Sequence, residues 1–193
     1  MEMLSNKDAN ELTYTIQNIV AKSYLEQKID LDQISKKIDN VQYNAKTFPG
    51  LFIRYSEPKS LIILFKTGRL VLTGLLKFIH IHTVLEKLIL DITNKTDYKI
   101  NVDLLRTEIV NIVITANYYK RIDLNLATIR LRNALYEPEI FPGVIFQNTK
   151  PYKGVFLVFS TGKVVLTGIK KKDNIEPLLI FLGKLLKEKK LFL

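Results

Sequence analysis

Four short polar side chains stand out in this sequence, because each lies two residues from a valine. Asn18 and Asn111 each precede a valine by two positions, and Thr73 and Thr167 each follow one by two positions. Side chains of a strand alternate between its faces, so each polar residue should share a face with its valine. The same periodicity builds an aliphatic floor from Val20, Val71, Ile63, Val113, Val165 and Leu157.

This combination of side chains suits the minor groove of DNA. A·T base pairs present only the acceptors adenine N3 and thymine O2 there, so a few amide and hydroxyl donors are enough to contact them. A close-packed valine and leucine floor would exclude the amino group that a G·C pair adds. Phenylalanines near the ends of the face, such as Phe65 and Phe159, could wedge between base steps. The nearby basic residues Arg54, Arg69 and Lys163 could contact phosphates.

The chain that carries these residues is a duplicated unit of about ninety residues. The stretch 65–74 recurs at 159–168, with Gly68 and Gly162 separated by 94 residues. Asn18-Ile19-Val20 matches Asn111-Ile112-Val113 at a spacing of 93, so one extra residue is expected between Pro151 and Phe159, at a turn. Each Thr-Gly pair predicts a hairpin turn, because glycine adopts positive φ without strain.

The elements that must position these residues follow the same order in both copies, namely a strand, a short helix, four strands and a helix. Strands are predicted in the first copy at 13–23, within 40–46, and at 51–55, 60–65 and 69–73, with helices at 30–37, capped by Asp30, and 76–92. In the second copy they are predicted at 108–116, 144–147, 155–159 and 163–167, with helices at 123–132 and 174–188. Residues 94–104 are polar and predict a linker. The predicted division is a short mobile tail at 1–12, a first repeat at 13–100 and a second repeat at 101–193.

The predicted strands are apolar on both faces. In residues 61–65 and 70–73, odd and even positions alike are hydrophobic, whereas an antiparallel sheet packed on helices normally alternates apolar and polar side chains. Helices can cover one face only, so the other face needs a partner that can pack against apolar side chains. A sandwich core between the two repeats would explain the pattern equally well.

Composition restricts the function further. The 193 residues are 47% hydrophobic with a net charge of +10, which indicates a folded protein with a polyanionic partner, unless the lysines serve only solubility. With no Cys and two His, at alternate positions 80 and 82 of a predicted helix, the sequence offers no disulfide, thiolate metal site or good histidine pair. We expect no enzyme, no cofactor, no signal peptide and no membrane partner.

The sequence resembles the TATA-box-binding protein family over most of its length. The motifs are Ile16-Gln17-Asn18-Ile19-Val20, Tyr43-Asn44, Glu57-Pro58, Tyr136-Glu137-Pro138-Glu139 with Phe141-Pro142-Gly143, and Gly162-Lys163-Val164-Val165-Leu166-Thr167-Gly168. The resemblance implies an α+β saddle of two pseudo-symmetric repeats, with a curved ten-stranded antiparallel sheet and four helices on its convex face. It also implies a general transcription initiation factor that bends TATA DNA and nucleates the pre-initiation complex.

The resemblance also implies a role for each motif residue. The kinking pairs would be Phe48 with Phe65 and Phe141 with Phe159. Asn18, Asn111, Thr73 and Thr167 would contact base edges with the aliphatic floor, and Arg54, Arg69 and Lys163 would contact phosphates. Glu137, Glu139 and Ile140 would contact a TFIIB-type initiation factor. Further implied partners are the RNA polymerase machinery, a TFIIA-type factor, ATPase or repressor regulators and, for the free protein, a second copy. The expected location is the nucleus, or the cytoplasm of an archaeon.

Some positions depart from the family pattern. Gln147 occupies the position that corresponds to Arg54, Thr47 replaces a residue that is usually basic, and Val110 stands where the first repeat has Gln17. Residues 76–82 are apolar where the family has a basic helix, and lysines gather instead at 170–172 and 187–190. These departures leave open the alternative that the chain is a divergent paralogue that acts mainly as a protein scaffold. A protein-interaction sandwich is the third reading.

Overall fold

The computed structural model describes residues 2–3 and 13–193, which form two compact units. The first-repeat unit comprises residues 18–110, and the second-repeat unit comprises residues 111–193 together with the described part of residues 1–17. Most of the predicted mobile tail, at 1 and 4–12, lies outside the described residues. Within it, Glu2–Met3 form a short strand, β1, that pairs with Tyr14 and Thr13.

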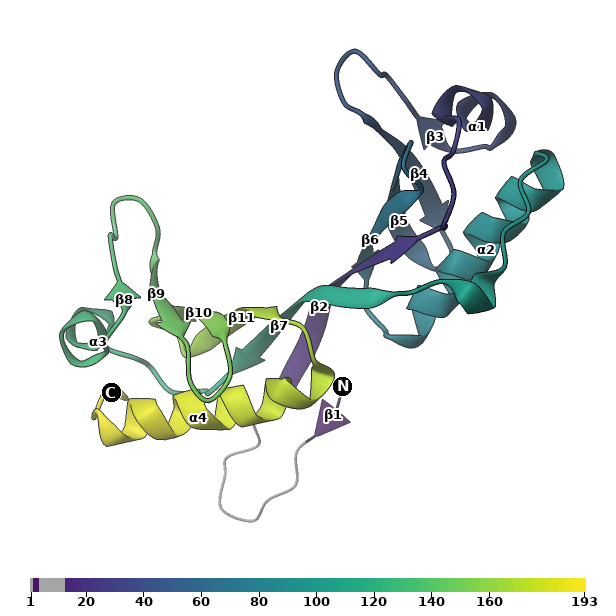
Figure 1. The fold of residues 1–193 in the computed structure, drawn as a ribbon. Helices are drawn as coiled ribbons and strands as arrows, with labels where there is room; N and C mark the ends of the chain where they lie inside the picture. The colour runs from purple at the N-terminus through teal and green to yellow at the C-terminus, as the bar shows by residue number, and fades with distance from the viewer. Residues whose placement is uncertain (1, 4–12) are drawn as a thin grey trace. The chain divides into compact units, whose positions relative to one another are not determined.

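The first-repeat unit is an antiparallel sheet in the order β3-β4-β5-β6-β2, with helices at one side of it (Figure 1). Its strands are β2 (Thr13–Tyr24), which also contributes to the other unit, β3 (Val41–Gln42), β4 (Gly50–Ser56), β5 (Lys59–Phe65) and β6 (Arg69–Leu75). Its helices are α1 (Leu31–Lys37), α2 (Ile79–Lys95) and a single 3-10 turn, η1 (Val102–Leu104).

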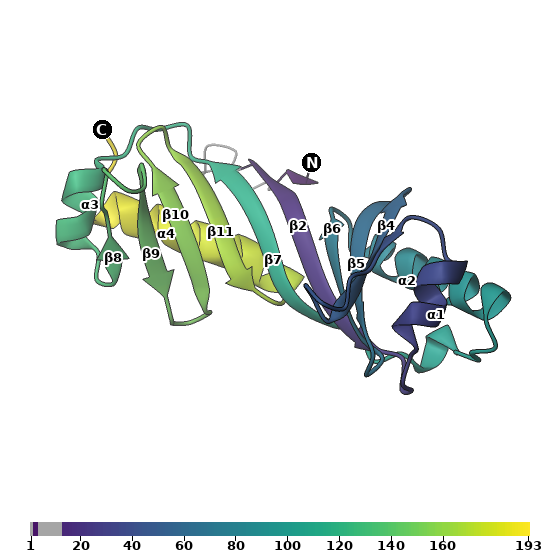
Figure 2. The same cartoon turned by 90° about the horizontal axis from the view of Figure 1, so that it is seen from above.

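The second-repeat unit repeats this arrangement in the order β2-β7-β11-β10-β9-β8, and α4 runs along one face of its sheet (Figure 2). Its strands are β7 (Glu108–Asn117), β8 (Ala134–Leu135), β9 (Gly143–Asn148), β10 (Gly154–Phe159) and β11 (Lys163–Ile169). Its helices are α3 (Leu124–Arg130), α4 (Ile175–Glu188) and the 3-10 turn η2 (Lys172–Asn174). The α+β class, the ten-strand path and the four helices are confirmed.

Local sequence signals explain where these elements begin and turn. The Asp30 carboxylate accepts hydrogen bonds from the backbone N–H groups of Asp32 (2.9 Å) and Gln33 (3.2 Å), as predicted for a helix cap. Gly68 and Gly162 adopt φ of +83° and +87° in the two hairpin turns. Each donates its N–H to the phenylalanine carbonyl three residues earlier, at 2.8 Å and 3.0 Å. The extra residue of the second copy falls in the loop 149–153, because Asn148 pairs with Gly154 whereas Ser56 pairs directly with Lys59.

The long helices bury one face of each sheet. In the first-repeat unit, Leu88 and Ile92 of α2 are fully buried, as are Ile62 and Leu64 of β5. In the second-repeat unit, the Tyr118 hydroxyl donates a 2.6 Å hydrogen bond to the carbonyl of Leu179 in α4. No helix in the described residues is long and apolar enough to span a bilayer.

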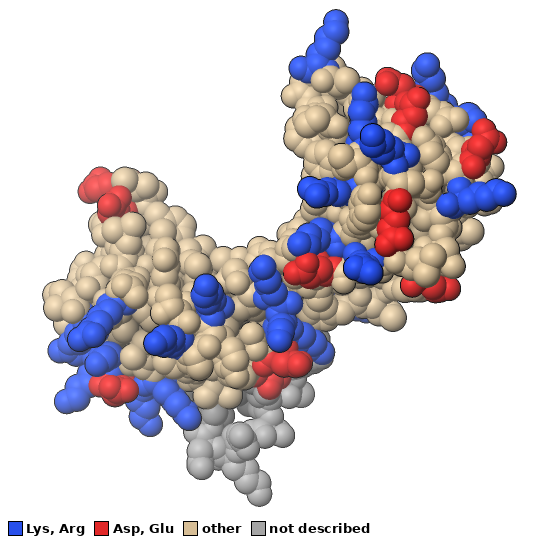
Figure 3. All heavy atoms as spheres, in the orientation of Figure 1, with Lys and Arg blue, Asp and Glu red and all other residues tan. Residues whose placement is uncertain are grey.

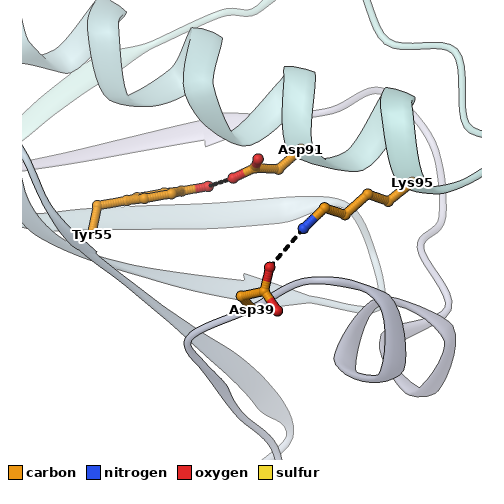
Figure 4. A network of polar contacts seen from close by, with 4 residues as sticks. All are labelled: Asp39, Tyr55, Asp91 and Lys95. Atoms are coloured by element: carbon orange, nitrogen blue, oxygen red, sulfur yellow. Dashed lines mark hydrogen bonds and ion pairs between the residues drawn. The ribbon is translucent and has the colours of Figure 1, made fainter.

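Polar contacts tie α2 to β4 and to the loop that follows α1 (Figure 4). The Tyr55 hydroxyl donates a 2.7 Å hydrogen bond to the Asp91 carboxylate, and Lys95 Nζ lies 2.8 Å from Asp39 Oδ2. Burial, followed by the hydrogen bond and the charge of Asp91, raises the pKa of Tyr55 well above its ordinary value. The hydroxyl therefore stays protonated and keeps its role as a donor.

Two predicted boundaries around α2 are wrong. The helix begins at Ile79 rather than Leu76, because β6 continues to Leu75, which is fully buried and pairs with Ile19. It ends at Lys95, inside the predicted linker, where the Thr96 hydroxyl and N–H both donate to the Ile92 carbonyl, at 2.6 Å and 2.9 Å. The rest of the predicted linker contains η1, so only part of residues 94–104 lacks helical structure.

Candidate nucleic-acid interface

The side chains predicted to form the floor lie on the sheet face that the helices leave uncovered. In β5, Leu61, Ile63 and Phe65 are partly exposed, whereas the alternate residues Ile62 and Leu64 are fully buried. β10 repeats this alternation, and in β6 and β11 the partly exposed positions are Val71, Thr73, Val165 and Thr167. We call this uncovered surface the open face of each unit. Within either unit, no described helix packs over it.

Each predicted asparagine lies beside its predicted threonine. Asn18 Nδ2 is 3.2 Å from Thr73 Oγ1, and Asn111 Nδ2 is 3.2 Å from Thr167 Oγ1. Asn18 belongs to the first-repeat unit with Thr73, and Asn111 belongs to the second-repeat unit with Thr167. The sequence predicted that each of these residues would share a face with a valine. Their contact with one another depends on strand pairing.

A β-bulge at the same place in each unit orients the asparagines. Between β2 and β6 the register changes so that the segment Leu72 to Leu75 faces Ala21 to Ile19, which leaves one extra residue in β6. Gly74 lies in this bulge with φ of +84°, and its N–H donates to Asn18 Oδ1 at 2.8 Å. The Asn18 oxygen is thereby held toward the backbone, so its NH₂ group is the part of the amide that can donate elsewhere.

The second-repeat unit contains the equivalent bulge between β7 and β11. Its register changes between Leu166 and Ile169, and Gly168 has φ of +77°. The Gly168 N–H donates to Asn111 Oδ1 at 2.9 Å. The two asparagines are therefore fixed by the same device, and both present amide donors beside a threonine hydroxyl.

The four predicted phenylalanines form one pair in each unit. The ring centroids of Phe48 and Phe65 are 6.0 Å apart, and those of Phe141 and Phe159 are 5.7 Å apart. All four side chains are partly exposed. Contact between aromatic rings at this separation is stabilising beyond the area that the rings bury. The two rings of each pair therefore form one apolar surface.

A glycine makes room for each pair of rings. A methyl group at Gly50 would lie 2.7 Å from Phe48 Cε1 and 3.1 Å from Phe65 Cε1. At Gly143 the corresponding distances to Phe141 and Phe159 are 3.0 Å and 3.1 Å. Such contacts are shorter than carbon atoms normally allow, so the Phe-Pro-Gly motif supplies one ring and the space that both rings need.

The predicted phosphate-binding residues are exposed, and the two units differ there. Arg54, Arg69 and Lys163 all point into solvent. Arg54 Nη1 lies 3.4 Å from Gln42 Oε1, and its guanidinium carbon is 6.0 Å from the Phe52 ring centroid. Gln147 takes the ladder position opposite Val155 that Arg54 takes opposite Leu61. The second-repeat unit therefore lacks the cation that the first-repeat unit has.

The loop predicted to contact an initiation factor is also exposed. Glu137, Glu139 and Ile140 are solvent-accessible, with Ile140 79% exposed. The Glu137 carbonyl accepts hydrogen bonds from the N–H groups of Ile140 (2.9 Å) and Phe141 (2.8 Å). The loop is thus a hydrogen-bonded turn that presents two carboxylates and an apolar side chain.

Four residues of the open faces were not predicted from the sequence, namely Phe52, Gln17, Lys22 and Glu108. Phe52 stacks on Phe48 with a centroid distance of 5.0 Å, and the period of two from Arg54 would have placed it there. Gln17 Nε2 donates to Thr115 Oγ1 at 2.8 Å in the second-repeat unit. Lys22 and Glu108 form an ion pair in the first-repeat unit. Among the described residues, no group of His, Asp and Glu could hold a metal ion.

Comparison with known proteins identifies the family. The family model for "Transcription factor TFIID (or TATA-binding protein, TBP)" matches residues 13–94 and 106–188. The TATA-box-binding protein of Aeropyrum pernix is 38% identical over 180 residues, which cover 90% of this chain and 84% of that protein. The TATA-box-binding protein of Sulfolobus acidocaldarius is 35% identical over 180 residues, covering 90% of this chain and 86% of that protein.

A solved structure agrees with the sequence comparison. The structure of Methanococcus jannaschii TBP superposes with a TM-score of 0.83 at 28% identity, covering 91% of this chain and 98% of that one. The matched family is one of non-catalytic transcription factors, which confirms the expectation that this chain is not an enzyme. The two matched segments together span both copies of the repeat. The chain therefore belongs to the TATA-binding protein family.

Proposed function

We propose that the open faces bind the minor groove of A·T-rich promoter DNA of the TATA class, kink it, and so begin assembly of the transcription pre-initiation complex. One observation carries the proposal. Both units present an asparagine–threonine pair and a phenylalanine pair on a partly exposed aliphatic face. A single such face would be ordinary, but the same four side chains recur at equivalent positions of two copies.

Recognition of A·T pairs follows from the fixed amides. The bulges hold Asn18 and Asn111 with their oxygens on backbone N–H groups, so their NH₂ groups donate toward the adenine N3 and thymine O2 acceptors. Thr73 and Thr167 add hydroxyl groups beside them. The floor formed by Val20, Val71, Val113 and Val165 leaves little space for the guanine amino group.

Kinking is assigned to the phenylalanine pairs. Exposed aromatic rings can enter between base steps, unstack them and bend the duplex away from the protein. In each unit the two rings lie together next to a glycine, so that they can act as one apolar wedge. Arg54, Arg69 and Lys163 then contact phosphates and make the affinity depend on salt.

Protein partners are assigned by surface chemistry. The exposed turn with Glu137, Glu139 and Ile140 suits a TFIIB-type factor with a basic surface. Regulators of the TFIIA, ATPase or repressor type, and the polymerase machinery, would join through other surfaces. In the absence of DNA, the apolar open faces could pair with a second copy. The relatives compared above are archaeal, which favours the cytoplasm of an archaeon over the nucleus.

A divergent paralogue that acts as a scaffold is the second candidate. It is favoured by Gln147 and by the apolar surface of α2, where Ile79 is 70% and Leu90 57% exposed. Lys and Arg side chains gather instead near the C-terminal end of α4 (Figure 3), in line with the exposed Lys184, Lys187 and Lys190. Such a protein would bind DNA weakly and without sequence preference.

Bending measured by fluorescence energy transfer separates the two candidates. A short duplex labelled at both ends is titrated with the protein, once with a TATA sequence and once with G·C substitutions, at two salt concentrations. Tight binding with a bend on the TATA duplex alone supports the proposed function. Equal binding to both duplexes, without a bend and lost at higher salt, would establish the scaffold instead.

A further inference from the structure

An ion pair lies on the open face of the first-repeat unit. Lys22 Nζ is 2.8 Å from Glu108 Oε2, and the two side chains are 56% and 58% exposed. Lys22 pairs with Val71 in the β2–β6 ladder, so it shares the face of that floor residue. The buried Ser23 ties the start of β7 to β2, because its hydroxyl lies 3.0 Å from Thr107 Oγ1 and 3.3 Å from the Arg106 carbonyl.

The second-repeat unit has neutral side chains at the equivalent positions. The spacing of 93 residues matches Lys22 with Thr115 and Glu108 with Thr15. Thr115 pairs with Val165, just as Lys22 pairs with Val71. Thr15 and Thr115 line a hollow of about 600 Å³ together with Val165 and Phe159. The two open faces therefore share their backbone arrangement here and differ in chemistry, with an ion pair in the first-repeat unit and two hydroxyl groups in the second-repeat unit.

The difference concerns hydrogen bonding in the minor groove. A carboxylate only accepts hydrogen bonds, so Glu108 suits the amino group that guanine presents there. Lys22 neutralises the carboxylate and can donate to the groove acceptors at the same step. In the second-repeat unit, Thr115 Oγ1 already accepts from Gln17 Nε2, which leaves its hydrogen to donate. That unit therefore has hydroxyl groups in place of the carboxylate, and they can donate to the acceptors that A·T pairs provide.

We infer that Lys22 and Glu108 let the first-repeat unit accept a purine amino group in the minor groove at a step where the second-repeat unit rejects it. The inference rests on the proposed binding of the minor groove. The protein would then bind a DNA site in a preferred orientation. A site with one minor-groove amino group fits when that group meets the first-repeat unit, whereas a site with an amino group at both symmetric positions fits in neither orientation.

A modified base isolates the amino group. In a symmetric A·T duplex, adenine is replaced position by position with 2,6-diaminopurine, which adds the guanine-type amino group and still pairs with thymine. Inosine·cytosine pairs, which lack that group, serve as the control for the altered pair. The dissociation constant is measured for the unmodified protein and for Glu108→Thr and Lys22→Thr with Glu108→Thr, which restore the residues of the second copy. Thr15→Glu with Thr115→Lys is the reciprocal transfer.

For the unmodified protein, one diaminopurine at the responsive position should change the dissociation constant by less than about threefold. Diaminopurine at both symmetric positions should weaken binding by about tenfold. Glu108→Thr should lose about tenfold with a single substitution, and the reciprocal variant should tolerate two. Equal losses for the unmodified protein and Glu108→Thr would overturn the inference. The proposed function fails separately, if the unmodified A·T duplex binds no better than a G·C duplex. Unchanged thermal midpoints verify that the variants are folded.

Discussion

The side-chain oxygen of Asn18 accepts a 2.8 Å hydrogen bond from the backbone N–H of Gly74. This N–H is available because Gly74, with φ of +84°, lies in a β-bulge where the ladder register changes. The bulge therefore sets which end of the amide faces the groove. Asn111 and Gly168 repeat the relationship at 2.9 Å.

Asn18→Asp should weaken binding to the TATA duplex by about 10- to 100-fold, because the variant keeps the acceptor for Gly74 and replaces the donor with a carboxylate that faces groove acceptors. Binding to a G·C duplex should change much less. Asn111→Asp is the matched variant and should behave alike. Equal losses on both duplexes would mean that the amide acts through overall charge and not through base contacts.

Phe48→Ala with Phe65→Ala should abolish the bend to a greater extent than it lowers non-specific affinity, because the rings act between bases while the cations hold phosphates. The end-to-end energy transfer and the dissociation constant are measured on the same duplex. Phe141→Ala with Phe159→Ala tests the other pair, whose rings lie at a similar distance. A double variant that still bends DNA fully would remove the wedge assignment.

Gly50→Ala should reduce bending while the phenylalanines remain in place. The added methyl group would lie 2.7 Å from Phe48 Cε1 and 2.9 Å from Ile63 Cγ2, so the ring and the floor must both move. Because these side chains are partly exposed and can shift, we expect a stability loss of about 1 kcal/mol, at the low end for overpacking. A bend equal to that of the unmodified protein would show that the ring position is not critical.

The sequence predicted most of the fold, because its signals were local and were repeated. Asp30 at a helix start and the glycines of the hairpin turns have the same conformational preference in any fold. The end of β6 was predicted too early, since the burial of Leu75 depends on its pairing with Ile19. No local signal could show that the chain continues as a strand there.

Prediction of the site was limited in the same way. The two-residue periodicity of strands predicts that Asn18 and Thr73 each share a strand face with a valine. The structure additionally brings Asn18 and Thr73 into contact with each other. Lys22 and Glu108 are 86 positions apart in the chain and belong to different strands, so only strand pairing reveals their contact. The bulge that orients the amide also depends on register, which the sequence of one strand does not determine.

Gln147→Arg should strengthen binding to all DNA sequences, because it gives the second-repeat unit the cation that Arg54 gives the first at the same ladder position. The slope of log affinity against log salt should become steeper by about 0.9. Lys163→Ala should flatten it by a similar amount. Lys184→Ala, on the exposed side of α4, is the control and should leave the slope unchanged. If Gln147→Arg left the salt slope unaltered, position 147 would not contact phosphate.

Tyr55→Phe should lower the free energy of unfolding by about 1–2 kcal/mol at neutral pH, because the buried donor to Asp91 is lost. The pKa of Tyr55 is raised by burial and then by Asp91, so the folded state holds a proton that the unfolded state releases near its ordinary pKa of 10.0. The stability contribution is therefore complete below about pH 10 and decreases as the pH rises further. Urea unfolding at about pH 7 and about pH 11 should show a smaller alkaline loss for Tyr55→Phe than for the unmodified protein. The partly exposed Tyr152→Phe should change neither quantity. If Tyr55→Phe and the unmodified protein lost the same stability at alkaline pH, other groups would account for the loss, such as the half-buried Tyr118, whose pKa is also raised by burial.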